Sequence, residues 1–153
     1  LCRAVYDAAC VTYNKLIYVF GGANKDNYAV SDVQVYNPVT QTCSILNPRM
    51  PRPYAYMRAV LYETSVILYH YETCFIYNFT TNKWQERAQF KTDVDGFGLV
   101  LDNQIIYIAG GRTDEIKSLP VDDIIQDKSV AVWKHHAKLP QRAGINVCGV
   151  VSV

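Results

Sequence analysis

The sequence has no excess of charge of either sign and no long hydrophobic run. Its 153 residues include 15 Lys and Arg and 14 Asp and Glu, which gives a formal net charge of +1. A nearly neutral chain gives no electrostatic reason to expect nucleic acid or an anionic membrane as a partner. Apolar runs such as residues 16–20 are far shorter than the roughly 20 residues that cross a bilayer. We therefore expect protein partners, with no nucleic acid and no membrane.

Paired cysteine motifs are also missing. The five cysteines are an odd number and form no Cys-x-x-Cys pair: Cys2, Cys10, Cys43, Cys74 and Cys148. This usage favours free thiols in a reducing cytosol over a disulfide scaffold, so we predict a cytoplasmic location. The triplet Asn78-Phe79-Thr80 satisfies the N-glycosylation rule, which argues for secretion, but a three-residue pattern is common by accident.

Groups that carry metal or acid–base chemistry are few. There are three histidines, His70, His135 and His136, and the adjacent pair points to opposite faces of a strand, so the two cannot easily share a metal. No histidine stands in a recognisable relation to Cys43 or Cys74, which we interpret as small apolar residues rather than nucleophiles. The sequence predicts no catalytic residue, no metal and no cofactor.

Short segments rich in β-branched and aromatic residues dominate the chain, and they predict an all-β fold. These segments are residues 15–20, 33–36, 65–69, 74–77 and 104–109. Tyr13-Asn14 and Asp102-Asn103 indicate tight hairpins between paired apolar runs. Residues 116–125 are the one stretch considered for a helical turn, and Pro120 weakens it. The start, Leu-Cys-Arg-Ala, has neither an initiator Met nor a signal-peptide pattern, so we expect a piece of a longer protein.

An internal repeat organises these strands. An apolar strand ending in a glycine pair occurs at residues 16–22 and again at residues 105–111, which places Gly21 and Gly22 in register with Gly110 and Gly111. Residues 65–69 have the same strand character but lack the glycines. Glycine at such a strand end allows a positive-φ turn in a crowded place.

A second marker keeps the same register. Tyr77 is followed seven residues later by Trp84, and the corresponding pairs are Tyr36 with Cys43 and Gln126 with Trp133. The three Trp-equivalent positions are about 41 and 49 residues apart, within the period of four-stranded propeller blades. Large flat side chains on the third and fourth strands are expected to pack against a neighbouring blade. A single blade cannot bury both of its faces, so neighbours are needed for stability.

The glycine pair, the turn Tyr-Asn-Pro-Val-Thr at residues 36–40 and the Tyr-x6-Trp spacing resemble Kelch repeats over nearly the whole chain. The resemblance implies a Kelch-type β-propeller, and since such rings close with about five to seven blades, a partial one. The expected blades are residues 4–47, 54–88 and 96–137, and the first strand of a further blade is expected at 143–153.

The resemblance also implies a binding face, formed by the links from second to third strand and from fourth to next first strand. We expect partner contacts from the residues of these links: Asn24, Lys25, Tyr28, Arg49, Arg52, Arg58, Arg112, Asp114 and Arg142. Arginine and tyrosine make orientable contacts to acidic or phosphorylated peptides. The other interpretation of each arginine is local pairing with Asp or Glu.

By resemblance, the expected function is substrate recognition in a BTB-Kelch protein, whose BTB domain, absent from this chain, recruits a cullin-3 ubiquitin ligase. The partner would be a protein substrate or peptide degron. One alternative is an actin-binding or cytoskeletal Kelch scaffold. Another is a propeller enzyme with its site outside this chain; the Ser-x-Asp-x-Gly-x-x-Trp boxes of sialidases and the ligand set of copper oxidases of the galactose-oxidase type are not present.

Overall fold

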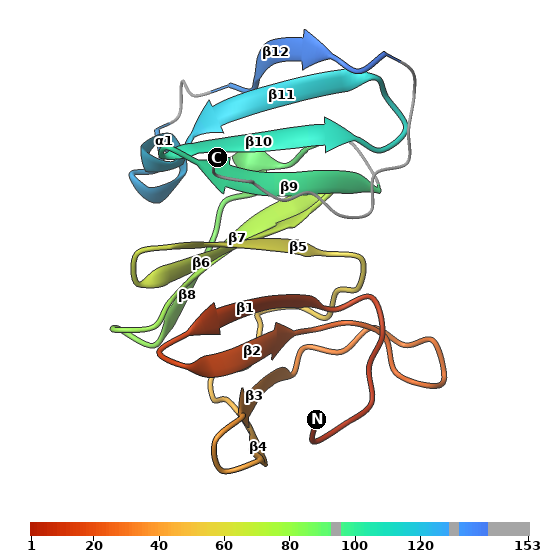
Figure 1. Ribbon diagram of the computed structural model, residues 1–153, viewed down its shortest axis with the longest axis vertical. Coiled ribbons are helices and arrows are strands. Elements are labelled where there is room, and N and C mark those ends of the chain that lie inside the picture. Colours follow the sequence, from red (N-terminus) through yellow and green to blue (C-terminus); the bar gives the residue numbers. More distant parts are fainter. Residues whose placement is uncertain (93–95, 129–131, 141–153) are drawn as a thin grey trace. The chain divides into compact units, whose positions relative to one another are not determined.

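The computed structural model describes residues 1–92, 96–128 and 132–140. Within these residues the strands form three antiparallel sheets of four strands each (Figure 1). The first sheet has the order β1 (Ala9–Tyr13), β2 (Leu16–Phe20), β3 (Val33–Asn37) and β4 (Thr42–Ile45). The second has β5 (Arg58–Tyr62), β6 (Ser65–His70), β7 (Thr73–Asn78) and β8 (Lys83–Glu86). The third has β9 (Phe97–Asp102), β10 (Ile105–Gly110), β11 (Glu115–Pro120) and β12 (Lys134–Lys138).

Each sheet is an up-and-down blade, as the repeat predicted. The expected all-β class and the expected strands are confirmed. We propose that the predicted blades, residues 4–47, 54–88 and 96–137, correspond to the three sheets. The further blade predicted at residues 143–153 lies outside the described residues. Two compact units divide the chain: Leu1–Leu68 with Tyr77–Gln85, and Tyr69–Ile76 with Glu86–Val153.

The hairpin turns follow from the asparagines that the sequence marked. Tyr13 pairs with Leu16, so Asn14 and Lys15 form a two-residue turn, and both have positive φ, at 48° and 63°. Asn103 and Gln104 repeat this between β9 and β10, with φ of 45° and 64°. Positive φ at both central residues matches the right-handed twist of the flanking strands.

A cluster of aromatic rings packs within the first unit. Tyr13 stacks on Phe79 with ring centroids 4.2 Å apart, and the edge of Phe20 meets Trp84 at 6.1 Å. Tyr77 lies 4.8 Å from Trp84, on the adjacent strand of its own sheet. Rings from β1 and β2 pack against rings from β8 and the turn before it. Trp84 thus packs against a ring of the first sheet, as expected of this marker, whereas the ring contacts of Tyr77 are with Phe79 and Trp84 of its own blade.

In the third sheet the expected register of Gln126 is wrong. The pairing of Ile106 with Leu119 matches the pairing of Ile17 with Tyr36, so Leu119 takes the tyrosine position. Gln126 instead caps a short helix, α1 (Val121–Ile125), that follows β11. Proline has no N–H for a strand ladder, so Pro120 ends β11, and extra residues separate it from Trp133.

Replacing Phe20 with alanine is expected to lower the free energy of unfolding by about 3–5 kcal/mol, because the ring is fully buried and its removal leaves a cavity. Denaturant-induced unfolding measures the change. Val39→Ala is the control: this side chain is 83% exposed in a turn, and its replacement should change stability by less than about 0.5 kcal/mol. Equal effects of the two substitutions would contradict the packing described.

Candidate functional site

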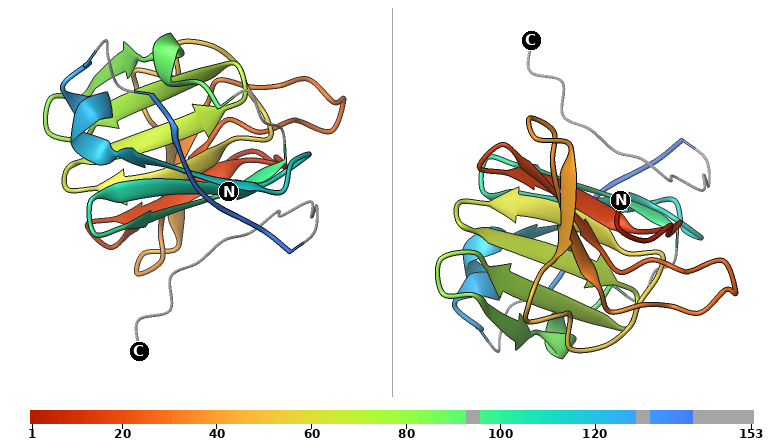
Figure 2. Two further views of the ribbon diagram at one scale, coloured as in Figure 1. Left: turned by 90° about the horizontal axis from the view of Figure 1, so that it is seen from above. Right: turned by 90° about the horizontal axis from the view of Figure 1, so that it is seen from below.

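The link between β2 and β3 runs beside the link between β4 and β5. The Gly22 N–H donates to the carbonyl oxygen of Tyr54 at 2.9 Å, and the Met50 N–H donates to that of Ser31 at 2.9 Å. Both views of Figure 2 show the β2–β3 link extending beyond the ends of its strands. Two of the links predicted to form the binding face are therefore joined in the first unit.

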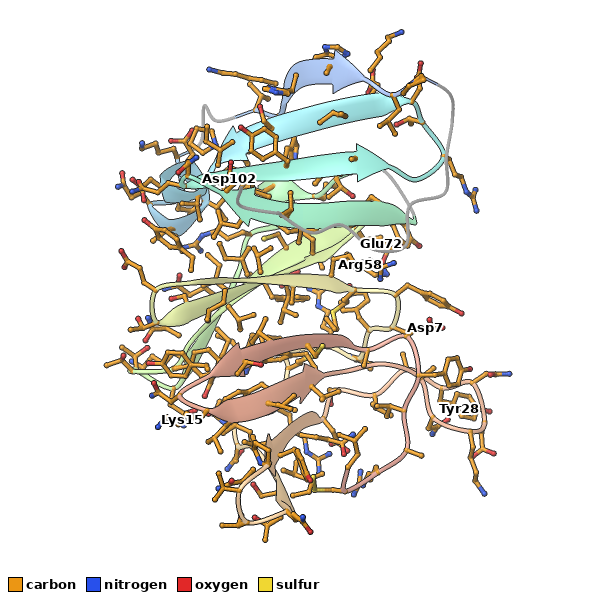
Figure 3. All side chains as sticks on the ribbon, in the orientation of Figure 1. Asp7, Lys15, Tyr28, Arg58, Glu72 and Asp102 are labelled. Atoms are coloured by element: carbon orange, nitrogen blue, oxygen red, sulfur yellow. A yellow bond between two sulfur atoms is a disulfide. The ribbon has the colours of Figure 1, made fainter. Side chains whose placement is uncertain are left out.

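The segment before β1 joins the same group. Tyr6 and Ala23 exchange two backbone hydrogen bonds, of 3.0 and 2.8 Å, and the Tyr56 N–H donates to the carbonyl oxygen of Asp7 at 2.8 Å. We call residues 5–7, 23–31 and 51–58 the loop surface. Asp7, Tyr28 and Arg58 lie at one end of the strands and Lys15 at the other (Figure 3).

The first glycine pair is required by this close approach. Gly21 and Gly22 have φ of 59° and 92°. A Cβ on Gly22 would lie 2.7 Å from the carbonyl oxygen of Tyr6, and one on Gly21 would clash with that of Tyr54. The predicted positive-φ role is confirmed, and the crowding comes from the two neighbouring segments.

Among the predicted contact residues of this surface, Lys25 and Tyr28 are presented to solvent. Tyr28 is 71% exposed. Asn24 has an internal role instead, since its Oδ1 accepts hydrogen bonds from the N–H groups of Asp26 and Tyr28, both at 3.0 Å. Such an Asx turn fixes the loop conformation. Asn24 therefore positions Lys25 and Tyr28.

The arginines of the first unit are engaged with the protein itself. Arg49 pairs with the buried carboxylate of Asp32 at 3.1 Å, and Arg3 pairs with the same carboxylate at 2.6 Å. Arg58 is half-buried and donates to the carbonyl oxygen of Met57 at 3.0 Å. Arg52 is exposed and also interacts within the chain. Local pairing is thus the better interpretation of Arg49.

Two exposed tyrosines of the loop surface were missed by the sequence analysis. Tyr6 is 42% exposed and Tyr56 is 60% exposed, and the Tyr6 hydroxyl hydrogen-bonds to Asn27. Tyrosine supplies large contact area at low entropic cost, which suits a binding surface. The only signal for them was their position in or beside the links, and Tyr56 lies two residues before the predicted Arg58.

In the second unit the corresponding link is short, because β10 ends at Gly110 and β11 begins at Glu115. Arg112 is exposed and interacts within the chain. Asp114 is tied to the end of β12: its carboxylate lies 3.8 Å from Lys138 Nζ, and its carbonyl oxygen accepts from the Leu139 N–H. Arg142 lies outside the described residues.

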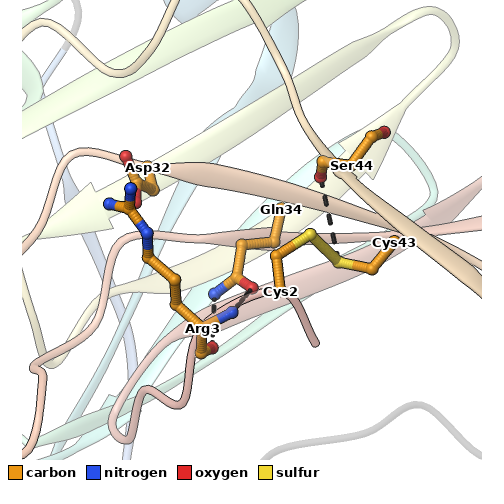
Figure 4. Close-up of a disulfide and its surroundings, with 6 residues drawn as sticks. All are labelled: Cys2, Arg3, Asp32, Gln34, Cys43 and Ser44. Atoms are coloured by element: carbon orange, nitrogen blue, oxygen red, sulfur yellow. Dashed lines mark hydrogen bonds and ion pairs between the residues drawn. A yellow bond between two sulfur atoms is a disulfide. The ribbon is translucent and has the colours of Figure 1, made fainter.

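The expectation of free thiols is wrong for two cysteines. Cys2 and Cys43 form a disulfide with Cα atoms 5.5 Å apart, within the normal range for such a bond (Figure 4). Cys10 is a free exposed thiol and Cys74 a free buried one. Because two of the five cysteines are bonded, the cysteine pattern does not support a reducing compartment.

Asn78 of the glycosylation triplet is occupied by the turn after β7. Its Oδ1 accepts from the N–H groups of Thr80 and Thr81, at 3.0 and 2.8 Å, and its Nδ2 donates to Ser65 Oγ at 3.1 Å. Asn37 forms the same kind of turn after β3. The triplet is therefore explained by a turn that recurs in the repeat, and it needs no glycosylation to explain it.

Within the described residues, no three or more His, Cys, Asp and Glu side chains are arranged to hold a metal ion. No helix among them has the length and apolar character needed to cross a membrane. The loop surface presents tyrosine rings, a lysine and backbone groups, and such a surface suits non-covalent binding.

Comparison with known proteins identifies the repeat. Residues 4–50 match the family model of the Kelch motif. The chain is 24% identical over 152 residues to Kelch-like protein 40 of Xenopus laevis, covering 92% of this chain and 24% of that protein. It is 25% identical over 122 residues to Kelch repeat and BTB domain-containing protein 2 of Ectromelia virus (strain Moscow), covering 74% and 21%. The solved structure of YjhT superposes with a TM-score of 0.70 at 14% identity, covering 89% of this chain and 53% of that one.

The fold is therefore that of a partial β-propeller. Residues 4–50 match a Kelch motif, and the chain resembles the Kelch-repeat domains of Kelch-like proteins. It spans about a quarter of the length of the curated relatives it matches. This resemblance supports a protein-interaction module.

Gly22→Ala is expected to destabilise the chain far more than Gly96→Ala, although both glycines have positive φ, at 92° and 68°. Gly96 has open space where a Cβ would lie, so its replacement carries only the backbone penalty of about 1–2 kcal/mol. Gly22→Ala adds the clash with Tyr6 and should lose about 4 kcal/mol or more by denaturant-induced unfolding. Similar losses of stability for the two variants would show that the segments carrying Gly22 and Tyr6 can move apart at little cost in free energy.

Burial raises the pKa of the Cys74 thiol well above its usual range. Because the thiolate is the nucleophile, Cys74 should react with iodoacetamide at pH 8 only upon unfolding, while exposed Cys10 reacts at once. Peptide mapping by mass spectrometry separates the two sites. Rapid native labelling of Cys74 would contradict its burial.

The raised pKa of Cys74 also makes stability depend on pH. The folded chain keeps this thiol protonated to a higher pH than the unfolded chain does, so the free energy of unfolding should fall as the pH rises above about 8.5.

Proposed function

We propose that this chain is part of the substrate-recognition propeller of a BTB-Kelch adaptor. In this proposal the propeller captures a protein substrate or a peptide degron without catalysing a reaction. A BTB domain elsewhere in the full-length protein recruits a cullin-3 ubiquitin ligase, and the complex acts in the cytoplasm. The similarity to Kelch-like protein 40 and to a Kelch repeat and BTB domain-containing protein supports this assignment.

The observation that carries the proposal is the loop surface. Three segments far apart in the sequence are hydrogen-bonded to one another and present Tyr6, Tyr28 and Tyr56 to solvent. Rigid aromatic side chains on well-fixed loops are typical of binding surfaces. Lys25, at the tip of the β2–β3 link, adds a cation that favours an acidic or phosphorylated substrate segment.

The double variant Lys25→Ala/Tyr28→Ala in the full-length protein tests this. Both side chains are exposed, so folding should be kept while substrate is lost in affinity purification from cells read by mass spectrometry. Removing an exposed contact tyrosine and a rim lysine is expected to weaken binding about tenfold or more.

Lys15→Ala/Val39→Ala is the matched control, because both residues are exposed in hairpin turns outside the loop surface. We expect cullin-3 to be recovered with the wild type and with both double variants. We expect one partner to be lost, and only from Lys25→Ala/Tyr28→Ala. Actin recovered without any ligase component would contradict the adaptor role. Partners retained by both variants would contradict the role of the loop surface.

A further inference from the structure

At the fourth strand of each blade, or directly before it, one side chain holds the chain segment that precedes that blade. In the second sheet, Trp84 Nε1–H donates to the carbonyl oxygen of Pro48 at 3.3 Å, across 36 positions of sequence. In the third blade, Trp133 lies directly before β12, and its Nε1–H donates to the carbonyl oxygen of Lys91 at 3.1 Å, across 42 positions. The tryptophan marker of the repeat thus fastens an incoming segment through its indole N–H.

In the first sheet a disulfide takes this place. Cys43 occupies the tryptophan position on β4, and it bonds to Cys2 across 41 positions of sequence. Cys2 lies in the segment that leads into β1, as Pro48 leads into β5. The same connection is made in all three blades, but only in the first is it covalent and open to reduction.

The disulfide secures a segment whose side chains are mostly exposed. Six of the seven residues that precede Ala8 are exposed, and only Val5 is half-buried. Near the disulfide, Arg3 exchanges two hydrogen bonds with the buried amide of Gln34, at 2.8 and 3.0 Å, and pairs with Asp32 (Figure 4). These contacts cover two buried polar side chains that would otherwise meet solvent.

The same segment continues into the loop surface. Tyr6 is bonded to Ala23 in both directions, and Asp7 accepts from the Tyr56 N–H. Whatever loosens residues 1–7 therefore also frees backbone groups of the β2–β3 and β4–β5 links. Exposed segments with few apolar contacts are the first to open locally.

We propose that the Cys2–Cys43 bond is a redox-controlled strap that sets how firmly residues 1–7 hold the loop surface. In its oxidised form the strap keeps Tyr6 and Asp7 paired with the two links. In its reduced form the segment opens more often and releases its hydrogen bonds to the two links, while the indole hydrogen bonds of Trp84 and Trp133 are kept.

The reaction is thiol–disulfide exchange with a dithiol. A thiolate of the dithiol attacks one sulfur of the bond, and the released cysteine sulfur takes up a proton. The second thiolate of the dithiol then resolves the mixed disulfide and releases the other cysteine. The protein gains two electrons and two protons, and the dithiol becomes a cyclic disulfide. Cys2 is exposed and Cys43 half-buried, so the bond is accessible to such an attack.

Backbone hydrogen exchange with and without dithiothreitol tests the proposal on the full chain. Reduction should speed exchange at the N–H groups of Tyr6, Ala23 and Tyr56 by about tenfold or more, because loss of a cross-link frees the segment. The Met50 N–H, bonded between the two links, should keep its rate. Peptide mapping after thiol blocking must show the Cys2–Cys43 bond before reduction.

Three variants complete the test. Cys2→Ser/Cys43→Ser should exchange fast at Tyr6 and Ala23 under both conditions, and Cys10→Ser should respond to dithiothreitol like the parent chain. Cys2→Ala/Cys43→Trp replaces the disulfide with the indole of the other blades, so it should exchange slowly and ignore dithiothreitol.

Two results would overturn the proposal. Equal exchange at Tyr6 and Ala23 in the oxidised, reduced and double-serine forms would show that the strap does not control the segment. A uniform rise that includes Met50 and strands β1–β4 would make the disulfide a general stabiliser of the blade. Neither result bears on partner capture, which the Lys25→Ala/Tyr28→Ala comparison tests separately.

Discussion

The structure depends on one constraint, that a four-stranded blade has two faces and cannot bury both by itself. In the first unit, a cluster of aromatic rings covers one of these faces. Tyr13, Tyr18 and Phe20 from one sheet contact Phe79 and Trp84 from the next repeat, with centroids between 4.2 and 6.1 Å. Aromatic pairs add to the stabilisation from buried area, and their preferred geometries fix how two sheets face each other. The loops can then be long and polar, since the strands do not depend on them for packing.

Most of the fold could be predicted because its determinants are local and repeated. The strands at 16–20 and 105–109 follow from β-branched residues, and the glycines after them follow from the need for positive φ. Where the repeat diverges, the prediction failed. Gln126 was assigned by counting seven residues back from Trp133, but Pro120 had already ended the strand, so spacing alone could not locate Leu119.

The candidate site was less predictable, because it depends on pairings between distant segments. The sequence identified the links. It did not show that Arg49 pairs with Asp32, which is 3% exposed, or that Tyr6 lies beside Ala23. The disulfide shows the same limit. Cys2 and Cys43 belong to no spacing motif, and only the path of the chain brings them together.

The connection between the third and fourth strands differs in length among the blades. It is a short turn after Asn37 and after Asn78, but in the third sheet it contains α1 and several further residues. The fourth strand β12 still pairs with β11 after this insertion, through a register shift between Ile116 and Lys117. A blade of this kind therefore buffers insertions at its outer hairpin, so genetic variation in length can accumulate there while the ladder of inner strands is left intact.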